Sequence, residues 1–253
     1  MKIAVLTGVT SGLGRELFEG LIKSYEKYDE YWLIARREDR LYELKSKFLN
    51  FNIVTLPLDL TDEESYKSFS ERLINYAPDI KVLINCAGMG KLGNLRDMPY
   101  YEQMKMVDLN NRALTVMTTL CLKYMRAGSF IVNVASIAAF APNPRMTVYC
   151  STKAYVLSFS KSLREELKPL KINCLAVCPG PMATEFLDVA GISGGKSKTF
   201  ETLPYCDPKK VAAGALKKAS HGKAVYTNRL FFKFYRVLAK LLPHNLVMKM
   251  SKT

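Results

Sequence analysis

IAVLTGVTSGLG, residues 3–14, joins a short apolar run to a loop that contains three glycines. The apolar run has the composition of a buried strand, and after the loop apolar residues recur at helical spacing. A glycine-rich loop between a strand and a helix is the context in which dinucleotide-binding folds hold a pyrophosphate. The stretch therefore predicts an α/β fold that opens with a phosphate-binding turn. An ordinary strand-to-helix turn is the alternative.

Each glycine of this loop has a separate expected role. Gly8 takes the tight turn, Gly12 lets the backbone approach the pyrophosphate, and Gly14 lets the helix pack closely on the strand. The phosphates would then lie at the helix N-terminus, where the helix dipole favours negative charge. The predicted cradle consists of Gly8, Thr10, Ser11, Gly12, Leu13 and Gly14.

Strand-like and helix-like patterns alternate along most of the 253 residues. Strands are expected at 3–7, 31–35, 53–58, 81–85, 130–135, 172–178 and 224–226, and the longest helical patterns lie near 101–126 and 148–168. Nearly continuous apolar strands in this rhythm predict a doubly wound parallel sheet, Rossmann-like and covered on both faces. The length suits one domain of this kind.

Composition excludes several classes of protein. Hydrophobic residues make up 49% of the chain and charged residues 24%, which excludes disordered and fibrous chains. Six cysteines without a CxxC pair indicate buried thiols in a reducing cytoplasm, and two histidines leave little material for a metal site or a Ser-His-Asp triad. The N-terminal apolar run is too short for a signal peptide, and no apolar run of about eighteen residues is present. No metal is expected, and the expected location is cytoplasmic.

Arg36 and Arg37 follow the second predicted strand, whose end faces the adenine ribose in a dinucleotide fold. Guanidinium groups there would bind a 2′-phosphate, so the expected cofactor is NADP rather than NAD. Glu38 and Asp39 are counter-evidence, although acids in the first turn of a helix are also favoured by its dipole.

Tyr149 and Lys153 lie four residues apart near the start of a predicted helix, and therefore on one face of it. An unperturbed phenol has a pKa of about 10, so it is a poor acid-base catalyst at neutral pH. A neighbouring ammonium and an oxidised nicotinamide would both favour the phenolate. Ser136 ends a predicted strand and could hold a substrate oxygen, whereas Asn110 is a polar residue inside a helical pattern. The alternative is a surface tyrosine and lysine on a helix.

Taken together, these motifs resemble the short-chain dehydrogenase/reductase family over roughly residues 2–226. The resemblance rests on TGVTSGLG at 7–14, Asp59, NCAG at 85–88, Asn110, Ser136, the Tyr149/Lys153 pair and PGPMAT at 179–184. The sequence departs from the family pattern at Cys86, where asparagine is frequent, and at Ala135, where serine is frequent. Neither departure affects the expected chemistry.

The resemblance implies a role for each matched residue. Tyr149 would be the general acid-base, Lys153 would lower its pKa and bind the nicotinamide ribose, Ser136 would position the carbonyl, and Asn110 would hold a water in a proton relay. The implied cofactor contacts are Asp59 and Leu60 at the adenine, Asn85, Ala87 and Gly88 toward the ribose, and Pro179, Gly180, Met182 and Thr184 toward the nicotinamide.

The function that follows is NADP(H)-dependent hydride transfer between the nicotinamide and a secondary alcohol or ketone. Specificity would come from residues 92–98, 140–146 and 183–207, with 191–205 as a candidate lid. An apolar substrate, of steroid, acyl or aromatic type, is suggested by Phe140, Met146, Phe186, Leu187 and Phe200.

Three rival functions remain. A sugar-nucleotide epimerase or dehydratase resembles TGxxGxxG instead and carries a larger C-terminal domain. A non-catalytic NADP-binding sensor or scaffold would keep the fold without the chemistry. Nucleic-acid binding rests only on the net charge of +14 and is not expected, since no recognition module accompanies it.

Residues 227–253 form a basic segment without a single acid, and residues 228–242 predict an amphipathic helix followed by a weaker tail. Arg229, Lys233, Arg236 and Lys240 would form one face, and Phe231, Phe234, Leu238, Leu241 and Leu242 the other. The apolar face either covers the substrate-side core or a subunit partner, or makes a peripheral membrane contact. Relatives usually form homodimers or homotetramers through the helices at 101–126 and 148–168.

Overall fold

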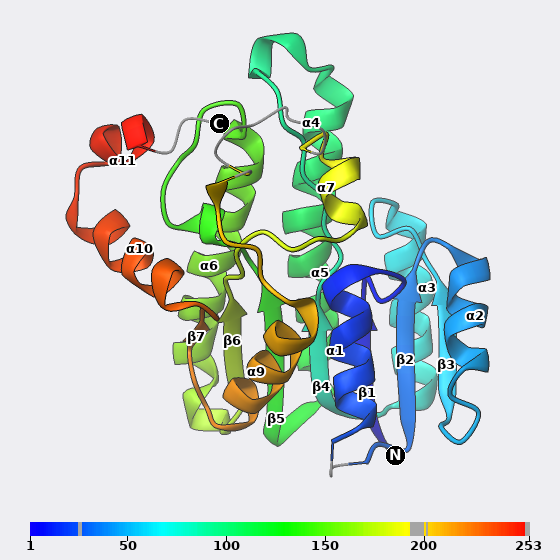
Figure 1. Ribbon diagram of the computed structural model, residues 1–253. Coiled ribbons are helices and arrows are strands. Elements are labelled where there is room, and N and C mark those ends of the chain that lie inside the picture. The colour runs from blue at the N-terminus through cyan, green and yellow to red at the C-terminus, as the bar shows by residue number, and fades with distance from the viewer. Residues whose placement is uncertain (25–26, 193–199, 201, 251–253) are drawn as a thin grey trace.

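The computed structural model describes residues 1–24, 27–192, 200 and 202–250 (Figure 1). The described residues contain one parallel sheet of seven strands in the order β3-β2-β1-β4-β5-β6-β7. The strands are β1 (Lys2–Thr7), β2 (Glu30–Ala35), β3 (Ile53–Pro57), β4 (Asp79–Asn85), β5 (Met125–Val134), β6 (Asn173–Val177) and β7 (Val225–Tyr226). Strand order reverses between β1 and β4, the position at which such sheets bind ligands. The predicted doubly wound fold is confirmed.

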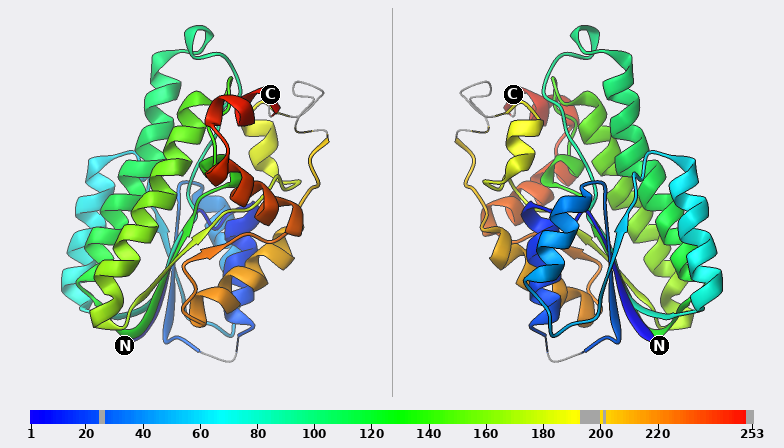
Figure 2. Two further views of the ribbon diagram at one scale, coloured as in Figure 1. Left: turned by 90° about the vertical axis from the view of Figure 1, so that its left-hand side faces the viewer. Right: turned by 90° about the vertical axis from the view of Figure 1, so that its right-hand side faces the viewer.

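Helices cover both faces of the sheet (Figure 2). One layer consists of α1 (Gly12–Ile22), α2 (Glu38–Ser46) and α9 (Pro208–Ser220), and the other of α3 (Glu63–Tyr76), α5 (Ala113–Leu122) and α6 (Thr147–Leu167). Because side chains alternate along a strand, Ala4 and Leu6 of β1 belong to the core under α1, whereas Ile3 and Val5 belong to the core under α5. The molecule is therefore a three-layer single domain.

The long helical pattern at 101–126 is not one helix. The chain forms α4 (Tyr100–Val107), a π-helical turn (Asp108–Arg112) and α5, and it enters β5 at Met125, five residues before the predicted strand. The π turn carries Asn110, whose side chain bonds the backbone of Met89 outside the helix. These bonds explain how a polar residue is accommodated inside a helical pattern.

Four short elements lie beyond the carboxyl ends of the strands: α4, α7 (Glu185–Val189), α10 (Leu230–Leu241) and α11 (His244–Met250) (Figure 1). The helix predicted at 228–242 is present as α10. The tail after Pro243, for which no helix was predicted, forms α11. Most of the candidate lid at 191–205, namely 193–199 and 201, lies outside the described residues. Within the described part of the chain, every helix is too short or too polar to cross a membrane.

Candidate active site

A cavity of about 680 Å³ opens at the carboxyl ends of the strands. Most of the predicted site residues line it, and they come from every motif of the sequence. They are Gly8, Thr10, Ser11, Gly12, Leu13, Gly14, Arg36, Arg37, Leu60, Ala87, Gly88, Ser136, Tyr149, Lys153, Pro179, Gly180, Met182 and Thr184. Asp59, Asn85 and Asn110 are predicted residues that lie outside this lining.

The glycine loop has the close approaches that its spacing predicts. Gly8 has a φ of +70°, and a Cβ placed on it would lie 2.7 Å from the Ala87 backbone. A Cβ on Gly14 would lie 2.1 Å from the carbonyl oxygen of Gly8, so the helix packs tightly on the turn. Gly12 has a φ of +52° and lies directly against Thr184, whose Cβ would be 3.3 Å from a Cβ on Gly12. The loop therefore presents bare backbone and a helix N-terminus to the cavity, which fits a dinucleotide.

A cluster of arginines lies at the end of β2. Arg37 donates hydrogen bonds of 3.1 Å to Thr10 Oγ1 and to the carboxylate of Glu185, and Arg40 bonds the same carboxylate. Arg36 lies 3.8 Å from the carboxylate of Asp59. The sequence analysis missed Arg40, although it lies one helical turn after Arg37 on α2. It also missed Glu185, because no sequence pattern connects positions so far apart.

Glu185 reaches this cluster from the first turn of α7. Hydrogen bonds from Arg40 and Arg37 lower the pKa of its carboxyl group. The two acids that counted against NADP, Glu38 and Asp39, occupy the first turn of α2, where the helix dipole stabilises a carboxylate.

Asn85 lies beneath the cavity. Its side-chain amide donates to Thr118 Oγ1 and to Asn133 Oδ1, both at 2.9 Å, and it is 4% exposed. Its amide donors join β4 to α5 and β5, and the expected contact of Asn85 with the ribose side stays a prediction. Its neighbour Cys86 lines the cavity instead.

Asp59 also stays outside the lining. Burial alone would raise the pKa of its carboxyl group, but hydrogen bonds from the amide and hydroxyl of Thr61 outweigh that effect and lower it. In the structure, Asp59 shapes the turn after β3 and attracts Arg36.

Ser136, Tyr149 and Lys153 come together at the centre of the cavity. Ser136 lies two residues after β5 and caps a short 3-10 turn, where its hydroxyl accepts a hydrogen bond from the Ala138 amide. Tyr149 and Lys153 lie in the first two turns of α6. Tyr149 is 7% exposed and Lys153 6%, which excludes the alternative of a surface pair. Lys153 Nζ lies 5.8 Å from the centroid of the Tyr149 ring and donates to the Val134 carbonyl oxygen at 2.9 Å.

The electrostatics of this centre differ from the sequence expectation. Burial raises the pKa of Tyr149, and its hydrogen bond with Ser136 offsets only part of that rise. Burial also lowers the pKa of Lys153 to about 8. The ammonium was expected to favour the phenolate. In the protein alone, however, desolvation acts on both groups and favours a neutral phenol.

Asn110 lies next to this centre and is 1% exposed. Its Oδ1 accepts from the Met89 amide, and its Nδ2 donates to the Met89 carbonyl and to Thr152 Oγ1, all at 2.9 Å. It therefore ties the loop after β4 to α6. A water held by Asn110 stays a prediction.

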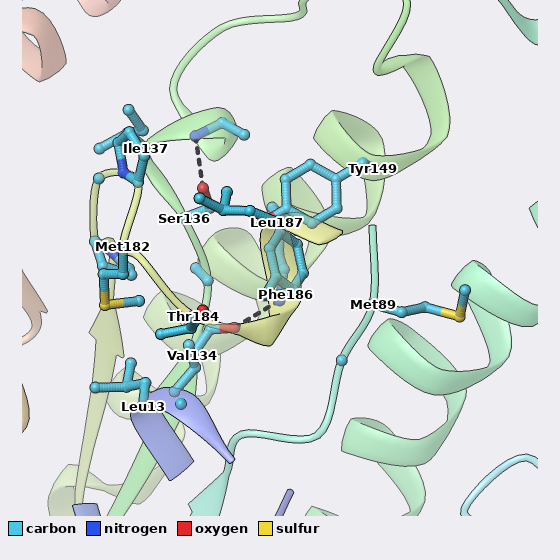
Figure 3. A pocket seen from close by; sticks show the side chains of 18 of the residues that line it. Leu13, Met89, Val134, Ser136, Ile137, Tyr149, Met182, Thr184, Phe186 and Leu187 are labelled. Atoms are coloured by element: carbon cyan, nitrogen blue, oxygen red, sulfur yellow. Dashed lines mark hydrogen bonds between the residues drawn. The ribbon is translucent and has the colours of Figure 1, made fainter. Parts of the chain in front are cut away.

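The remainder of the cavity wall is apolar. Figure 3 shows the ring of Tyr149 close to Phe186 and Leu187, with Met182 on one side of the pocket and Met89 on the other. The centroids of the Tyr149 and Phe186 rings are 5.8 Å apart. An apolar substrate would therefore meet hydrocarbon next to the phenol hydroxyl.

The C-terminal helices complete this wall, so part of the apolar face covers the substrate side of the core, which is one of the predicted alternatives. Phe231, Phe232, Tyr235, Leu238, Leu242 and Val247 all line the cavity. A Cβ on Gly180 would lie 2.1 Å from the ring of Phe232, so α10 packs directly on the loop after β6. The only advance signal was the apolar character of the helix.

Comparison with known proteins identifies the fold and the chemistry. The family profile described as short chain dehydrogenase matches residues 2–191. A probable NADP-dependent dehydrogenase of Haemophilus influenzae is 31% identical over 233 residues, 90% of this chain and 91% of its own length.

Two solved structures are similar over nearly the whole chain, each at 26% identity. The short-chain dehydrogenase of Sphingobium yanoikuyae in complex with NADPH has a TM-score of 0.81 and covers 98% of this chain and 96% of its own. The bulky-bulky ketone specific alcohol dehydrogenase of Comamonas testosteroni has a TM-score of 0.75 and covers 95% and 93%. The chain therefore belongs to the short-chain dehydrogenase/reductase family and is an NAD(P)-dependent oxidoreductase of alcohol and carbonyl groups.

Proposed function

We propose that this protein is an NADP(H)-dependent oxidoreductase that reduces an apolar ketone to the secondary alcohol and, in the reverse direction, oxidises that alcohol to the ketone. The observation that carries the proposal is the buried group of Ser136, Tyr149 and Lys153 at the junction of a dinucleotide cradle and an apolar cavity wall. A polar reacting centre next to a hydrocarbon wall suits a substrate that is apolar apart from its carbonyl.

The arginine cluster supports NADP over NAD. Arg36, Arg37 and Arg40 bring three guanidinium groups to the end of β2 and the start of α2, and Arg36 and Arg37 line the cavity. Arginine pairs with phosphate through two parallel hydrogen bonds, which suits a 2′-phosphate. Two relatives, a probable NADP-dependent dehydrogenase and a short-chain dehydrogenase in complex with NADPH, support this assignment.

In the proposed mechanism the chain binds the cofactor and the substrate and moves a proton. When bound, the nicotinamide cofactor supplies or accepts the hydride. Tyr149 donates its phenolic proton to the carbonyl oxygen during reduction, and Ser136 donates a hydrogen bond to the same oxygen and stabilises its developing charge. Lys153 stabilises the phenolate that Tyr149 becomes, and Asn110 holds the loop of Met89 and the proposed water.

The remaining proposed cofactor contacts follow from the lining of the cavity. Residues 8–14 hold the pyrophosphate, Leu60, Ala87 and Gly88 border the adenosine side, and the loop at 179–184 borders the nicotinamide. Gly12 and Thr184 lie in contact and connect the glycine loop to the loop at 179–184.

The substrate class remains broader than one compound. The wall formed by Met146, Phe186 and Leu187 suits steroid, acyl or aromatic carbonyls alike. A relative whose printed name specifies bulky-bulky ketones supports a ketone with large groups on both sides.

We also propose a homodimer or homotetramer in a reducing cytoplasm. Met104 and Val107 on α4 are exposed large apolar side chains, which suits a subunit contact there. All six cysteines are unpaired thiols, which fits a reducing compartment.

A panel of ketones tests the proposed function. Purified protein is mixed with NADPH or NADH and with cyclic, aromatic and long-chain ketones, and the loss of nicotinamide absorbance is followed. We expect turnover with NADPH on at least one apolar ketone and much weaker turnover with NADH. Tight NADPH binding without turnover on any ketone would favour the non-catalytic sensor instead.

A further inference from the structure

Helix α10 has three faces, whereas its sequence suggests two. The inner face packs through Phe232, which is 0% exposed, and Ala239, which is 3% exposed. A second face carries basic side chains. The third face, here called the outer stripe, is an exposed apolar row that consists of Leu230, Phe234, Val237 and Leu241, which are 81%, 64%, 53% and 73% exposed.

The outer stripe follows from helical spacing. Its members recur at intervals of four, three and four residues, and a helix turns about 100° per residue, so they lie within a narrow arc. Phe234 and Leu241, expected on the apolar face, belong to this stripe, whereas Leu238 from the same predicted face turns toward the cavity. Figure 1 places α10 at one edge of the molecule, beside β7 and α6.

The basic row runs beside the outer stripe. Arg229 donates a hydrogen bond to the Tyr205 carbonyl oxygen, and Arg236 lies 6.0 Å from the centroid of the Phe140 ring. Lys233 and Lys240 are exposed, and in the described part of the chain neither forms an ion pair with a carboxylate. Residues 227–253 contain no acid at all.

We infer that α10 lies on an anionic lipid surface, with the outer stripe in the acyl boundary and the basic row at the headgroups. Apolar side chains next to cations, without an intervening acid, are complementary to such a surface. No described helix can span a membrane, so the contact is peripheral. The inference goes beyond the proposed function, since it does not depend on which carbonyl is reduced.

A second copy of this chain fits the same face less well. In a twofold dimer the patch meets itself, so the basic rows of both copies would lie in one interface. Residues 227–253 offer no carboxylate to compensate them. Anionic headgroups supply the missing charge.

The position of the stripe also connects the lipid to the cavity. Phe231 and Leu238 lie between the outer stripe and the inner face on the helical wheel, and both line the cavity. An apolar carbonyl dissolved in the bilayer would therefore meet a continuous apolar path from the surface toward Tyr149.

Co-sedimentation of the full chain with vesicles tests the inference. One set of vesicles contains phosphatidylcholine alone, and the other an equal mixture of phosphatidylcholine and phosphatidylglycerol. We expect binding to the mixed vesicles that weakens as salt rises. Truncation at residue 226 is unsuitable because it would remove Phe232 from its place against Gly180.

Paired point variants separate the two parts of the surface. Phe234→Gln with Leu241→Gln removes apolar side chains that do not line the cavity, and Ile74→Gln with Leu170→Gln is the matched control at comparably exposed positions. We expect the first pair to abolish binding to the mixed vesicles and the control pair to bind them as wild type.

A second pair tests the charge. Lys233→Gln with Lys240→Gln should weaken binding to the mixed vesicles by about thirtyfold, because each cation near an anionic surface adds roughly one kilocalorie per mole. Lys217→Gln with Lys218→Gln, in the last turn of α9, is the matched control and should leave binding unchanged. Ketone reduction in solution should be the same in all four variants.

Three outcomes overturn the inference. The full chain could stay in the supernatant with both vesicles at low salt, or the Phe234/Leu241 pair could bind as wild type. Sedimentation velocity could instead reveal a dimer that the Phe234/Leu241 pair dissociates, which would make the stripe a subunit interface. In each case the proposed oxidoreductase activity would stand, because none of these residues lines the cavity.

Discussion

The phenol of Tyr149 is held neutral by its surroundings, since burial raises its pKa more than the Ser136 hydroxyl lowers it. A neutral phenol holds the proton that a carbonyl oxygen needs during reduction. Lys153 is buried beside it and has a pKa lowered to about 8, so keeping its ammonium costs stability at neutral pH. Both groups are therefore held where their charged forms lose hydration, and such shifts in pKa are typical of reacting centres.

Tyr149→Phe should retain NADPH binding and lose turnover. The change deletes only the hydroxyl, and general acid-base catalysis contributes roughly 10²- to 10⁴-fold. Turnover is measured by NADPH absorbance and binding by fluorescence titration. Tyr155→Phe, at a 43% exposed position on the same helix, is the control and should behave as wild type. Equal activity of the two variants would remove Tyr149 from the mechanism.

Lys153 should make stability depend on pH in a defined direction. Its pKa is lowered by burial from 10.5 to about 8, so in that interval the unfolded chain binds a proton that the folded protein has released. Stability must then rise with pH across the interval, by at most about 1.4 kcal/mol per pH unit.

Urea unfolding of wild type and Lys153→Met, at pH values between about 8 and about 10, measures this contribution as the difference between the two. The difference should grow in favour of wild type as pH rises. Burial raises the pKa of cysteines such as Cys121 and Cys150 and opposes the trend, but both proteins share that effect. Lys161→Met, at an exposed position of α6, is the control, and the difference in stability between it and wild type should stay flat over this pH range. A flat difference for Lys153→Met would contradict the burial of its charge.

Arg36→Ala with Arg37→Ala should weaken NADPH binding about ten- to a hundredfold, since a hydrogen bond to a charged group contributes about 1.5 to 3 kcal/mol. NADH lacks the 2′-phosphate and should lose much less. The two dissociation constants are compared by fluorescence titration. Equal losses for both cofactors would mean that these arginines serve the surface rather than the phosphate.

At the scale of elements, Glu185 connects α7 to α2 through Arg37 and Arg40. Its carboxylate holds the same guanidinium groups that a 2′-phosphate would need. Glu185→Gln should therefore tighten NADPH binding relative to NADH. The gain should be at most about fivefold, because exposed ion pairs contribute about 0.2 to 1 kcal/mol.

Glu43→Gln is the matched control for this variant. Glu43 is an exposed acid on α2, and it pairs with Lys47 rather than with the arginine cluster. It should leave the affinity for both cofactors unchanged. Weaker NADPH binding by Glu185→Gln would indicate that the carboxylate orders the arginines instead of competing for them.

The elements differ in how far their sequence predicts them. The strands and the glycine loop follow from local patterns, because apolar runs and the needs of a tight turn are local. The π turn is not predictable in this way, since Asn110 is held by Met89 and Thr152, which are distant in sequence. Asn85 matched a motif, yet its amide serves a buried network with Thr118 and Asn133. The burial of Phe232 on the inner face of α10 likewise depends on its contact with Gly180. Gly180 lies outside the helix, so the periodicity of the helix does not predict this contact.

At the scale of the whole molecule, cations gather in two places, and the second contributes to the net charge of +14. One is the arginine cluster at the end of β2, which pairs with Glu185 and Asp59, and the other is the basic row of α10, which lies in a segment without acids. Neither resembles a nucleic-acid-binding module. Arg36 and Arg37 of the cluster line the cavity, and the basic row belongs to a helix whose other side chains line it. The charge is thus linked to the proposed cofactor and to the inferred lipid surface.

The C-terminal helices belong to the same cooperative unit as the sheet, because Phe232 is wholly buried in the core that α1 and α9 share. Phe232→Ala should therefore lower the free energy of unfolding by about 3 to 5 kcal/mol, the cost of removing a buried aromatic ring. It should also raise KM for the ketone, since Phe232 lines the cavity.

Phe234→Ala provides the control on the same helix, two residues away. Its ring is 64% exposed, so the loss should stay within about 0.5 kcal/mol. Urea unfolding followed by circular dichroism measures both variants. A small effect of Phe232→Ala, equal to that of Phe234→Ala, would mean that α10 separates from the domain before it unfolds. The cavity would then lack the stable wall on which both the apolar substrate class and the lipid-facing orientation of α10 depend.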